Sequence, residues 1–318
     1  MNGGQRRRWR ELDGIVLLDK PQGLSSNDAL QKVRRIFGAA KAGHTGALDP
    51  LATGMLPICF GEATKFAGYL LDADKGYRTT ARLGVRTTTS DAEGEVVSEK
   101  PVDVSLEQLN NALAQFRGPQ QQVPSIWSAL KYEGHPYYWY ARRGIDIPRP
   151  ARAITIYQLE LVAFDGVDAV LDVRCSKGTY IRSLVDDLGE LLGCGAHVST
   201  LRRTAVSNFP LTSMHSLEAF AALRGDGETP AAELDALLLP LTWTVQDLPK
   251  LQLNDAQAIA VGFGQKLAAA QTNIAEMTDL AEGARLQLWH GEQFLGIAEL
   301  VDGTVHPKRM ISQRPVVE

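Results

Sequence analysis

The sequence of 318 residues predicts an α+β fold, and three observations carry that prediction. Apolar and polar side chains alternate in pairs of strand-length segments joined by short turns, which indicates antiparallel hairpins. Single segments with apolar side chains at helical spacing lie between these hairpins. Strands and helices do not alternate regularly, as they would in a parallel sheet.

The first predicted strand is the apolar run 14–19, which ends at a turn containing Pro and Gly. A helix is predicted next, because Ser25 stands at the start of a segment with helical apolar spacing and Gly38 stands at its end. Residues 41–54 hold three glycines and one proline and show little periodicity. We interpret them as a structured loop.

The helix predicted at 181–192 has the strongest apolar periodicity in the chain and stops at Gly193. If Thr179 caps it, Arg182 is the third residue of its first turn. The other predicted elements before residue 200 are a helix at 63–70, strands at 77–83 and 96–97, a helix at 106–116, and a hairpin of 154–164 with 167–175.

Three regions follow from this order of elements. Residues 1–12 form a basic arm with four arginines, and 13–247 form the α+β domain. An acidic stretch rich in Ala and Leu, 216–247, closes that domain. Strand-like runs at 286–289, 294–301 and 305–310 indicate a small β-rich domain at 248–318.

The composition excludes several classes of protein. Apolar residues make up 44% of the chain, as in globular proteins, and no apolar run approaches the roughly 20 residues of a membrane span. No secretion signal follows the N-terminal arginines. The three cysteines, Cys59, Cys175 and Cys194, form no C-x-x-C pair. We therefore expect a cytoplasmic protein without disulfides, structural zinc or a membrane anchor.

The charge is unevenly distributed along the chain. Residues 1–203 hold 26 Lys and Arg against 23 Asp and Glu, whereas residues 204–318 hold 7 against 14. The first part could bind a polyanion although the whole chain carries a net charge of −4. A solvated surface of mixed charge explains the same numbers.

Residues 43–54, Gly-His-Thr-Gly-Ala-Leu-Asp-Pro-Leu-Ala-Thr-Gly, are the most informative stretch. Glycines let a loop turn sharply or approach a ligand, and such loops often carry catalytic groups. Asp49 is a candidate nucleophile or base, but an Asp before Pro50 also commonly caps a turn. His44, taken alone, is more often structural than functional.

Residues 124–152 contain six aromatic residues, five Lys or Arg and two acidic residues. Aromatic rings stack on bases and cations neutralise phosphates, so the segment suits unpaired nucleic acid, although its rings could equally pack on the core. Arg182 near the positive end of a helix suggests an anionic partner such as Asp49, against the alternative of a solvated side chain. Tyr77 lies on the inward face of its strand and could be plain core.

Together these motifs resemble the TruB-type tRNA pseudouridine-55 synthases. The resemblance covers roughly residues 13–210. It rests on residues 14–21 with 25–27, 43–54, 75–77, 177–182 and 201–203. It implies an α+β catalytic domain at 13–247 with a mixed, largely antiparallel sheet, a mobile RNA-gripping thumb at 124–152, and a PUA-like RNA-binding domain at 248–318.

The resemblance also implies the roles of individual residues. Asp49 would be the nucleophile, Tyr77 would stack on the target base, and Arg182 would pair with Asp49. Among the substrate-binding residues, His44 would support the displaced T-loop. Tyr180 and Leu201 would contact the flipped nucleotide, and the last substrate-binding residue implied is Lys20.

The implied reaction converts uridine 55 in the T-arm of tRNA to pseudouridine. It replaces a C1′–N1 bond by a C1′–C5 bond without redox change, so we expect neither a cofactor nor a metal. The expected partner is tRNA alone, bound by a monomer.

One alternative is a tRNA-binding folding chaperone whose catalysis is secondary. Another is a metal hydrolase using His44 and Asp49, for which the sequence offers no third ligand at a suitable spacing. The chain departs from the family at Trp127, where Tyr is more common, and at His135-Pro136, where a basic pair is common.

Overall fold

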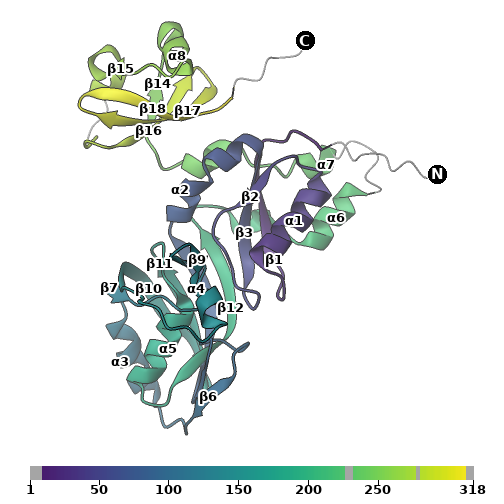
Figure 1. Ribbon diagram of the computed structural model, residues 1–318, viewed down its shortest axis with the longest axis vertical. Coiled ribbons are helices and arrows are strands. Elements are labelled where there is room, and N and C mark those ends of the chain that lie inside the picture. The colour runs from purple at the N-terminus through teal and green to yellow at the C-terminus, as the bar shows by residue number, and fades with distance from the viewer. Residues whose placement is uncertain (1–8, 226–231, 277–279, 313–318) are drawn as a thin grey trace, which may run out of the picture.

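The computed structural model describes residues 9–225, 232–276 and 280–312. The chain forms an elongated molecule with a small sheet at one end and a large sheet with its helices in the rest (Figure 1). Most of the basic arm predicted at 1–12 lies outside the described residues. No described helix is long and apolar enough to cross a membrane.

The large sheet has nine strands within the described residues and confirms the predicted α+β class. Its strand order is β13-β1-β3-β12-β4-β11-β10-β7, and β2 pairs with β3 beside this path. Only the β1–β13 and β3–β12 pairs are parallel. The bounds are β1 Gly14–Lys20, β2 Ala42–His44, β3 Thr53–Phe60, β4 Lys75–Leu83, β7 Gly118–Gln122, β10 Arg152–Phe164, β11 Asp168–Cys175, β12 Ala196–Val206 and β13 Met214–His215.

Helices cover the sheet in the way that local sequence predicts. The first helix, α1 Ser26–Phe37, is capped by the Ser25 side chain, which accepts a hydrogen bond from the Asp28 N–H, and it ends at Gly38 in the left-handed conformation. Residues 15–18 of β1 are all apolar because the two faces of the strand pack into two different clusters. The other helices are α2 Ala67–Asp72, α3 Leu106–Gln115, α5 Ile181–Leu191, α6 Leu217–Arg224 and α7 Ala232–Asp235.

The prediction of a loop throughout 41–54 is wrong at both ends, where β2 and the start of β3 lie. Strand β3 contains Pro57, which argues against a strand in sequence. Gly54 has a φ of +98°, and a Cβ atom there would lie 2.2 Å from the Arg203 carbonyl oxygen. Only glycine therefore allows the close approach of β3 to β12, on which the shape of the intervening loop depends.

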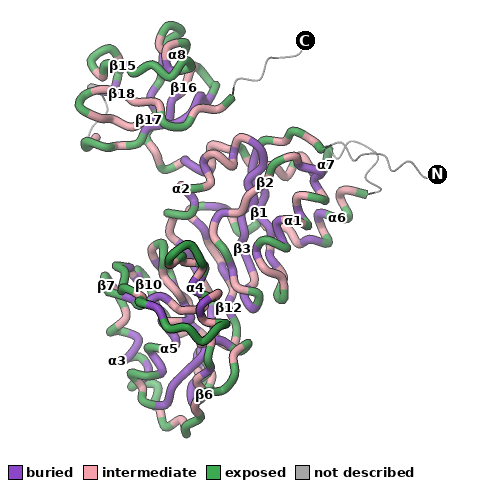
Figure 2. Tube along the Cα trace, viewed as in Figure 1, coloured by how far each residue is buried: buried purple, intermediate pink, exposed green. Residues whose placement is uncertain are grey.

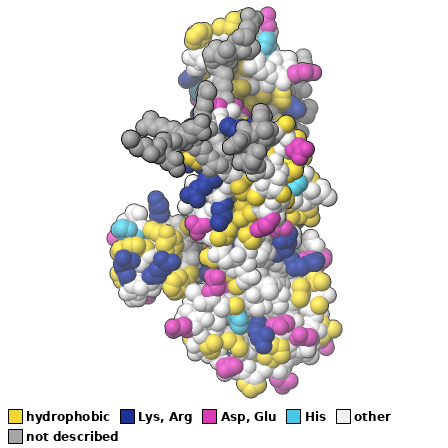
Figure 3. Space-filling model, turned by 90° about the vertical axis from the view of Figure 1, so that its right-hand side faces the viewer, with side chains coloured by type: hydrophobic (Ala, Val, Ile, Leu, Met, Phe, Trp, Pro, Cys, Tyr) yellow, Lys and Arg dark blue, Asp and Glu magenta, His cyan; other side chains and the backbone are white. Residues whose placement is uncertain are grey.

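The aromatic segment 124–152, called the thumb below, forms strands β8 Lys131–Tyr132 and β9 His135–Pro136 and helix α4 Tyr137–Ala141. Tyr137, Tyr140 and Ile147 form a small cluster of their own, so these rings pack on one another instead of on the main core. In Figure 3 the thumb is the knob at the side of the molecule, where hydrophobic side chains gather with Lys and Arg.

The C-terminal part has a separate five-stranded sheet and its own apolar cluster, as the sequence predicts. Figure 2 shows buried residues inside this sheet and inside the large one. The elements of the C-terminal part are β14 Lys250–Gln252, α8 Asp255–Gly262, β15 Leu267–Ala268, β16 Arg285–His290, β17 Gln293–Val301 and β18 Thr304–Met310. A further buried cluster, which we call the interface cluster, joins the C-terminal sheet to the rest of the chain: Phe294 and Ile297 of β17 pack with Phe66 at the start of α2 and with Val245.

Candidate active site

The loop that carries Asp49, residues 45–52, connects β2 to β3. Residues outside the loop form hydrogen bonds with its backbone. The Ser26 hydroxyl donates to the Leu48 carbonyl at 3.0 Å and accepts from the Leu48 N–H at 2.7 Å. The Gly23 N–H donates to the Pro50 carbonyl at 2.8 Å. The turn after β1 and the start of α1 therefore set the position of Asp49.

Lys20 also stabilises this loop, through hydrogen bonds to backbone carbonyls. Its side chain is fully buried, and its ammonium group donates to the carbonyls of Ala52 at 2.7 Å, Pro21 at 2.9 Å and Pro50 at 3.4 Å. Burial lowers the pKa of Lys20 to about 8. Because three carbonyls accept its three protons, Lys20 helps to shape the loop in this structure. The substrate-binding role that the resemblance implies for Lys20 stays a prediction.

Arg182 meets Asp49 from the opposite side, at the start of α5. Its Nε lies 2.9 Å from Asp49 Oδ2, and its Nη1 lies 3.5 Å from Asp91 Oδ2. Two backbone carbonyls complete its partners, Thr89 at 3.1 Å and Trp127 at 3.2 Å. The last of these connects the guanidinium to the thumb.

The start of α5 differs from its prediction. Tyr180 occupies the N-cap position, without a side-chain cap, and Arg182 is therefore the second helical residue. The Thr179 hydroxyl donates instead to the Ser176 carbonyl at 3.0 Å. The unfavourable position of a cation in the first turn is offset by the two carboxylates that face it.

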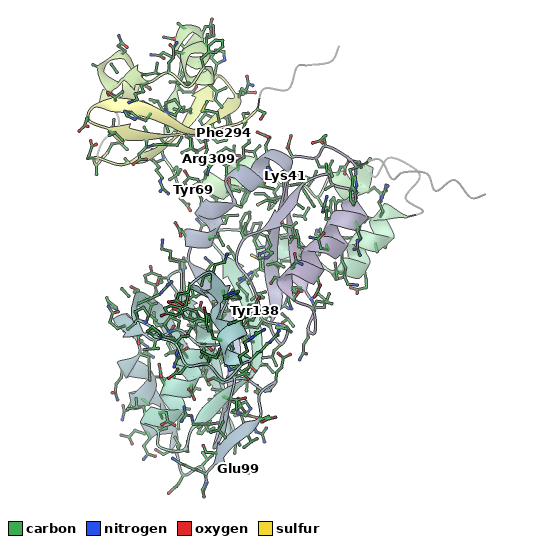
Figure 4. All side chains as sticks on the ribbon, in the orientation of Figure 1. Lys41, Tyr69, Glu99, Tyr138, Phe294 and Arg309 are labelled. Atoms are coloured by element: carbon green, nitrogen blue, oxygen red, sulfur yellow. The ribbon has the colours of Figure 1, made fainter. Side chains whose placement is uncertain are left out.

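Asp49 and Arg182 line a cavity of about 570 Å³. Its wall combines the loop, the start of α1, the segment 89–93 and the thumb residues Trp127, Tyr138 and Arg142. Figure 4 labels Tyr138 on the thumb. The guanidinium of Arg142 lies over the ring of Tyr138, 5.4 Å from its centroid. The cavity thus offers a carboxylate, a guanidinium and a cation-backed aromatic ring to one ligand.

Burial dominates the electrostatics of Asp49. It raises the pKa of the carboxyl, and the negative charge of Asp91 raises it further, while Arg182 and Lys20 act in the opposite direction. The sequence anticipated only the effect of Arg182. The Asp49 side chain is still 40% exposed and so is accessible to a ligand. A carboxylate with a raised pKa is a stronger base than a free one.

His44 also lines this cavity, at the end of β2. Burial and the charge of Arg203 lower the pKa of His44, so its ring is neutral at pH 7. Its Nδ1 is buried and has no hydrogen-bond partner among the described residues. A neutral ring with a vacant nitrogen is able to accept or donate one hydrogen bond to a ligand.

Tyr77, Tyr180 and Leu201 are not among the residues that line the cavity. Tyr77 packs against the main core. Burial raises the pKa of its phenol, and the charge of Arg203 acts in the opposite direction. Leu201 is buried on β12, opposite Thr79 of β4. Burial raises the pKa of Tyr77 and of Tyr180, and the negative charge of Asp49 adds to both shifts.

Sequence reasoning missed Asp91, Glu93 and the individual thumb residues that line the cavity. Asp91 is buried, and the Thr89 hydroxyl and the Glu93 N–H donate to its carboxylate. Residues 91–94, Asp-Ala-Glu-Gly, are typical of a turn, and the sequence gives no sign that they face Arg182. Among the described residues, no group of three or more His, Cys, Asp or Glu side chains could hold a metal ion.

Three family models match consecutive parts of the chain. The N-terminal domain of the TruB family pseudouridylate synthases matches residues 34–181. The tRNA pseudouridylate synthase B C-terminal domain matches 182–246, and the C-terminal model of pseudouridine synthase II TruB matches 249–311.

Curated relatives are similar over nearly the whole chain. The tRNA pseudouridine synthase B of Yersinia enterocolitica is 53% identical over 97% of this chain and 94% of its own length. The protein of the same name from Tolumonas auensis is 54% identical over 98% and 96%. A solved chain in the archaeal box H/ACA sRNP Nop10–Cbf5 complex superimposes with a TM-score of 0.73 at 23% identity, covering 96% of this chain and 88% of that one. The last likeness shows the fold.

Proposed function

This chain belongs to the TruB family of pseudouridylate synthases, an isomerase family, and from that premise we propose that it isomerises uridine 55 in the T-arm of tRNA with Asp49 as the reacting carboxylate. The observation that carries the proposal is the pair of Asp49 and Arg182, 2.9 Å apart in a cavity open to a ligand. Relatives named tRNA pseudouridine synthase B support tRNA as the substrate.

The reaction needs few groups, and the cavity contains them. The C1′–N1 bond breaks and a C1′–C5 bond forms in the same molecule, so no atoms or electrons enter or leave. Asp49 either attacks carbon or takes a sugar proton, and both steps require its ionised form. The guanidinium of Arg182 favours that form and aims one carboxylate oxygen.

The target base reaches Asp49 only if it leaves its stack. We propose that the base flips into the cavity, that Tyr77 stacks on it, and that Tyr180 and Leu201 contact the flipped nucleotide. His44 supports the displaced T-loop with its vacant Nδ1. Tyr77, Tyr180 and Leu201 leave the cavity free for the base, and the charge of Asp49 contributes to the raised pKa of both tyrosines.

Contacts away from the base hold the tRNA. We assign this role to the thumb, where Arg142 and Tyr138 face the cavity, and to the C-terminal domain from about residue 248. Figure 4 shows Arg309 of the C-terminal sheet on the side that faces Tyr69 of the catalytic part. A cation at this position is available to phosphates that extend beyond the T-loop.

The test is incubation of the protein, as a monomer, with an unmodified tRNA transcript, followed by chemical mapping of pseudouridine. We expect one modified position, the T-loop uridine 55. Modification of any other uridine in its place would contradict the proposed specificity, and binding without modification would favour the RNA-chaperone alternative.

A further inference from the structure

We propose that Arg203 is a positioning residue for this reaction: it sets the spacing between Tyr77 and the loop that carries Asp49. The inference rests on the proposed function, because it assumes that both residues meet the same base. Arg203 itself lines no part of the cavity wall and does not touch the substrate in this account.

The backbone places Arg203 between the two halves of the site. On β12 it pairs with Tyr77 of β4, across an antiparallel register, and with Gly54 of β3, across a parallel one. Strand β3 begins where the loop ends. The position of Arg203 is therefore fixed relative to both the ring and the loop before its side chain makes any contact.

The side chain then joins the three elements. It is 1% exposed. Its Nε donates to the Met55 carbonyl at 2.7 Å, and its Nη2 donates to the Gly46 carbonyl at 3.2 Å. Tyr77 lies opposite Arg203 in the strand register, and its phenol interacts electrostatically with the guanidinium. The donors of a guanidinium form a rigid planar fork and reach acceptors that lie apart, whereas the donors of a lysine ammonium all belong to one nitrogen.

Arg203 also completes a regular set of restraints on the loop. Every second carbonyl from 46 to 52 accepts a hydrogen bond from a side chain: Gly46 from Arg203, Leu48 from Ser26, and Pro50 and Ala52 from Lys20. Gly46 has a φ of +95°, which most residues avoid. Arg203 thus restrains the first half of the loop, and Lys20 restrains the second half.

The charge of Arg203 makes a purely structural role a poor explanation. Within the described residues no carboxylate forms a salt bridge with it, and the acceptors of its hydrogen bonds are backbone carbonyls. The cation also lowers the pKa of its neighbours Lys20, Lys75 and His44. Burying an unpaired charge is costly, and an apolar side chain of similar volume would pack without that cost. Such costs are typical of functional sites.

The expected effect follows from geometry. A carboxylate and a stacked ring act on one base only when their separation matches it, and a misplacement of about 1 Å costs on the order of 100-fold in rate. In Arg203→Lys the charge stays buried, but the fork that spans Tyr77, Met55 and Gly46 is lost. We expect the single-turnover rate at saturating tRNA to fall roughly 10- to 100-fold. The dissociation constant for tRNA should stay within about twofold.

Arg202→Lys is the matched control. Arg202 is the adjacent residue on β12, and its guanidinium forms two hydrogen bonds with Asp19 outside the cavity. We expect this variant to keep the wild-type rate. Thermal unfolding of each variant separates loss of folded protein from loss of rate in the folded, tRNA-bound enzyme.

A second variant and a double variant make the test decisive. Arg203→Met removes the buried charge and packs well, so it should fold at least as stably as Arg203→Lys and be at least as slow. In a Tyr77→Phe background, Arg203→Lys should cost less than in the wild type, because the phenol oxygen that Arg203 holds is already absent.

Three results would overturn the proposal: wild-type single-turnover rates in both folded Arg203 variants, a loss confined to tRNA affinity, or failure of both variants to fold. Failure of the proposed function has a different signature. It would appear in the wild-type protein as an absence of pseudouridine, or in Asp49→Asn as full activity, whatever the result at Arg203.

Discussion

Replacing Phe294 by Ala should loosen the C-terminal domain from the catalytic part and weaken tRNA binding more than it slows the chemistry. The Phe294 side chain is 6% exposed and lies in the interface cluster. Its ring meets Phe66 of the catalytic part edge-on, with centroids 5.5 Å apart, and meets Trp289 of its own sheet at the same distance. Figure 4 shows Phe294 on the side of the C-terminal sheet that faces the catalytic part.

The size of the effect follows from the packing. Truncation of a buried Phe to Ala costs roughly 3–5 kcal/mol, of which each edge-to-face pair accounts for about 0.5–1.5 kcal/mol. We take about 3 kcal/mol, because the interface can relax. Since about 1.4 kcal/mol is tenfold in an equilibrium constant, the docked arrangement becomes roughly 100-fold less favoured.

The consequence for binding depends on how the two parts share one tRNA. Linked binding modules reinforce each other only while their geometry permits both to engage. We expect the dissociation constant to rise about tenfold or more, and the single-turnover rate at saturating tRNA to stay within about threefold. Asp49 and Arg182 are not members of the interface cluster, so their pairing should survive.

The assay compares Phe294→Ala with Phe263→Ala, a substitution in the same domain at a side chain that is 81% exposed. Phe263→Ala should change neither unfolding nor tRNA binding measurably. The reasoning is wrong if Phe294→Ala unfolds like the wild type, or if its rate at saturating tRNA collapses while its affinity is normal.

Four further predictions follow. Removal of the chain from residue 248 exposes Phe66, so the truncated protein should melt at a lower temperature as well as bind tRNA more weakly; an unchanged melting temperature would contradict this. Affinity for tRNA should fall steeply between low and physiological salt, because cations meet phosphates, and a flat response would make the basic residues a solvated surface. Burial raises the pKa of Asp49, so the rate should fall as the pH drops through a value above the reference pKa of about 4. Asp91→Asn removes a negative charge that raises this pKa, so the fall in rate should move to lower pH. A pH profile that does not move would count against Asp49 as the titrating group. A chelator should leave the rate unchanged, and a loss that added metal restores would favour a metal hydrolase.

Local signals in the sequence predicted the elements whose burial follows a simple period. Helix α1 has an N-cap, an apolar face and a terminal glycine, and the structure contains each of them. The hairpin of β10 and β11 alternates and has an Asp-Gly turn. The sequence also indicated Asp49 and Arg182 as partners, because an arginine in a first turn needs an anion.

Strand β12 was not predicted, because it buries charged and polar side chains, whereas a strand is recognised in sequence by its buried apolar ones. It lies at the centre of the sheet, yet it buries Arg203 and His197 through hydrogen bonds that only the folded structure supplies. The buried position of Lys20 was not predicted for the same reason, since two of its three carbonyl partners, Pro50 and Ala52, lie about 30 residues further along the chain. Asp91 comes from a turn that gives no sign in sequence that it faces Arg182.

The most direct test of the central claim is the single-turnover rate of Asp49→Asn on an unmodified tRNA transcript, measured beside tRNA affinity. The amide keeps the size of the carboxylate and can still hydrogen bond, but it cannot act as an anionic nucleophile or base. Asp165→Asn, in the exposed hairpin turn between β10 and β11, is the matched control, because Asn suits that turn equally well. We predict that Asp49→Asn forms no pseudouridine at uridine 55 while its tRNA affinity stays near wild type, and that Asp165→Asn is fully active. Turnover by Asp49→Asn above a few per cent of the wild-type rate would remove Asp49 from the centre of the mechanism.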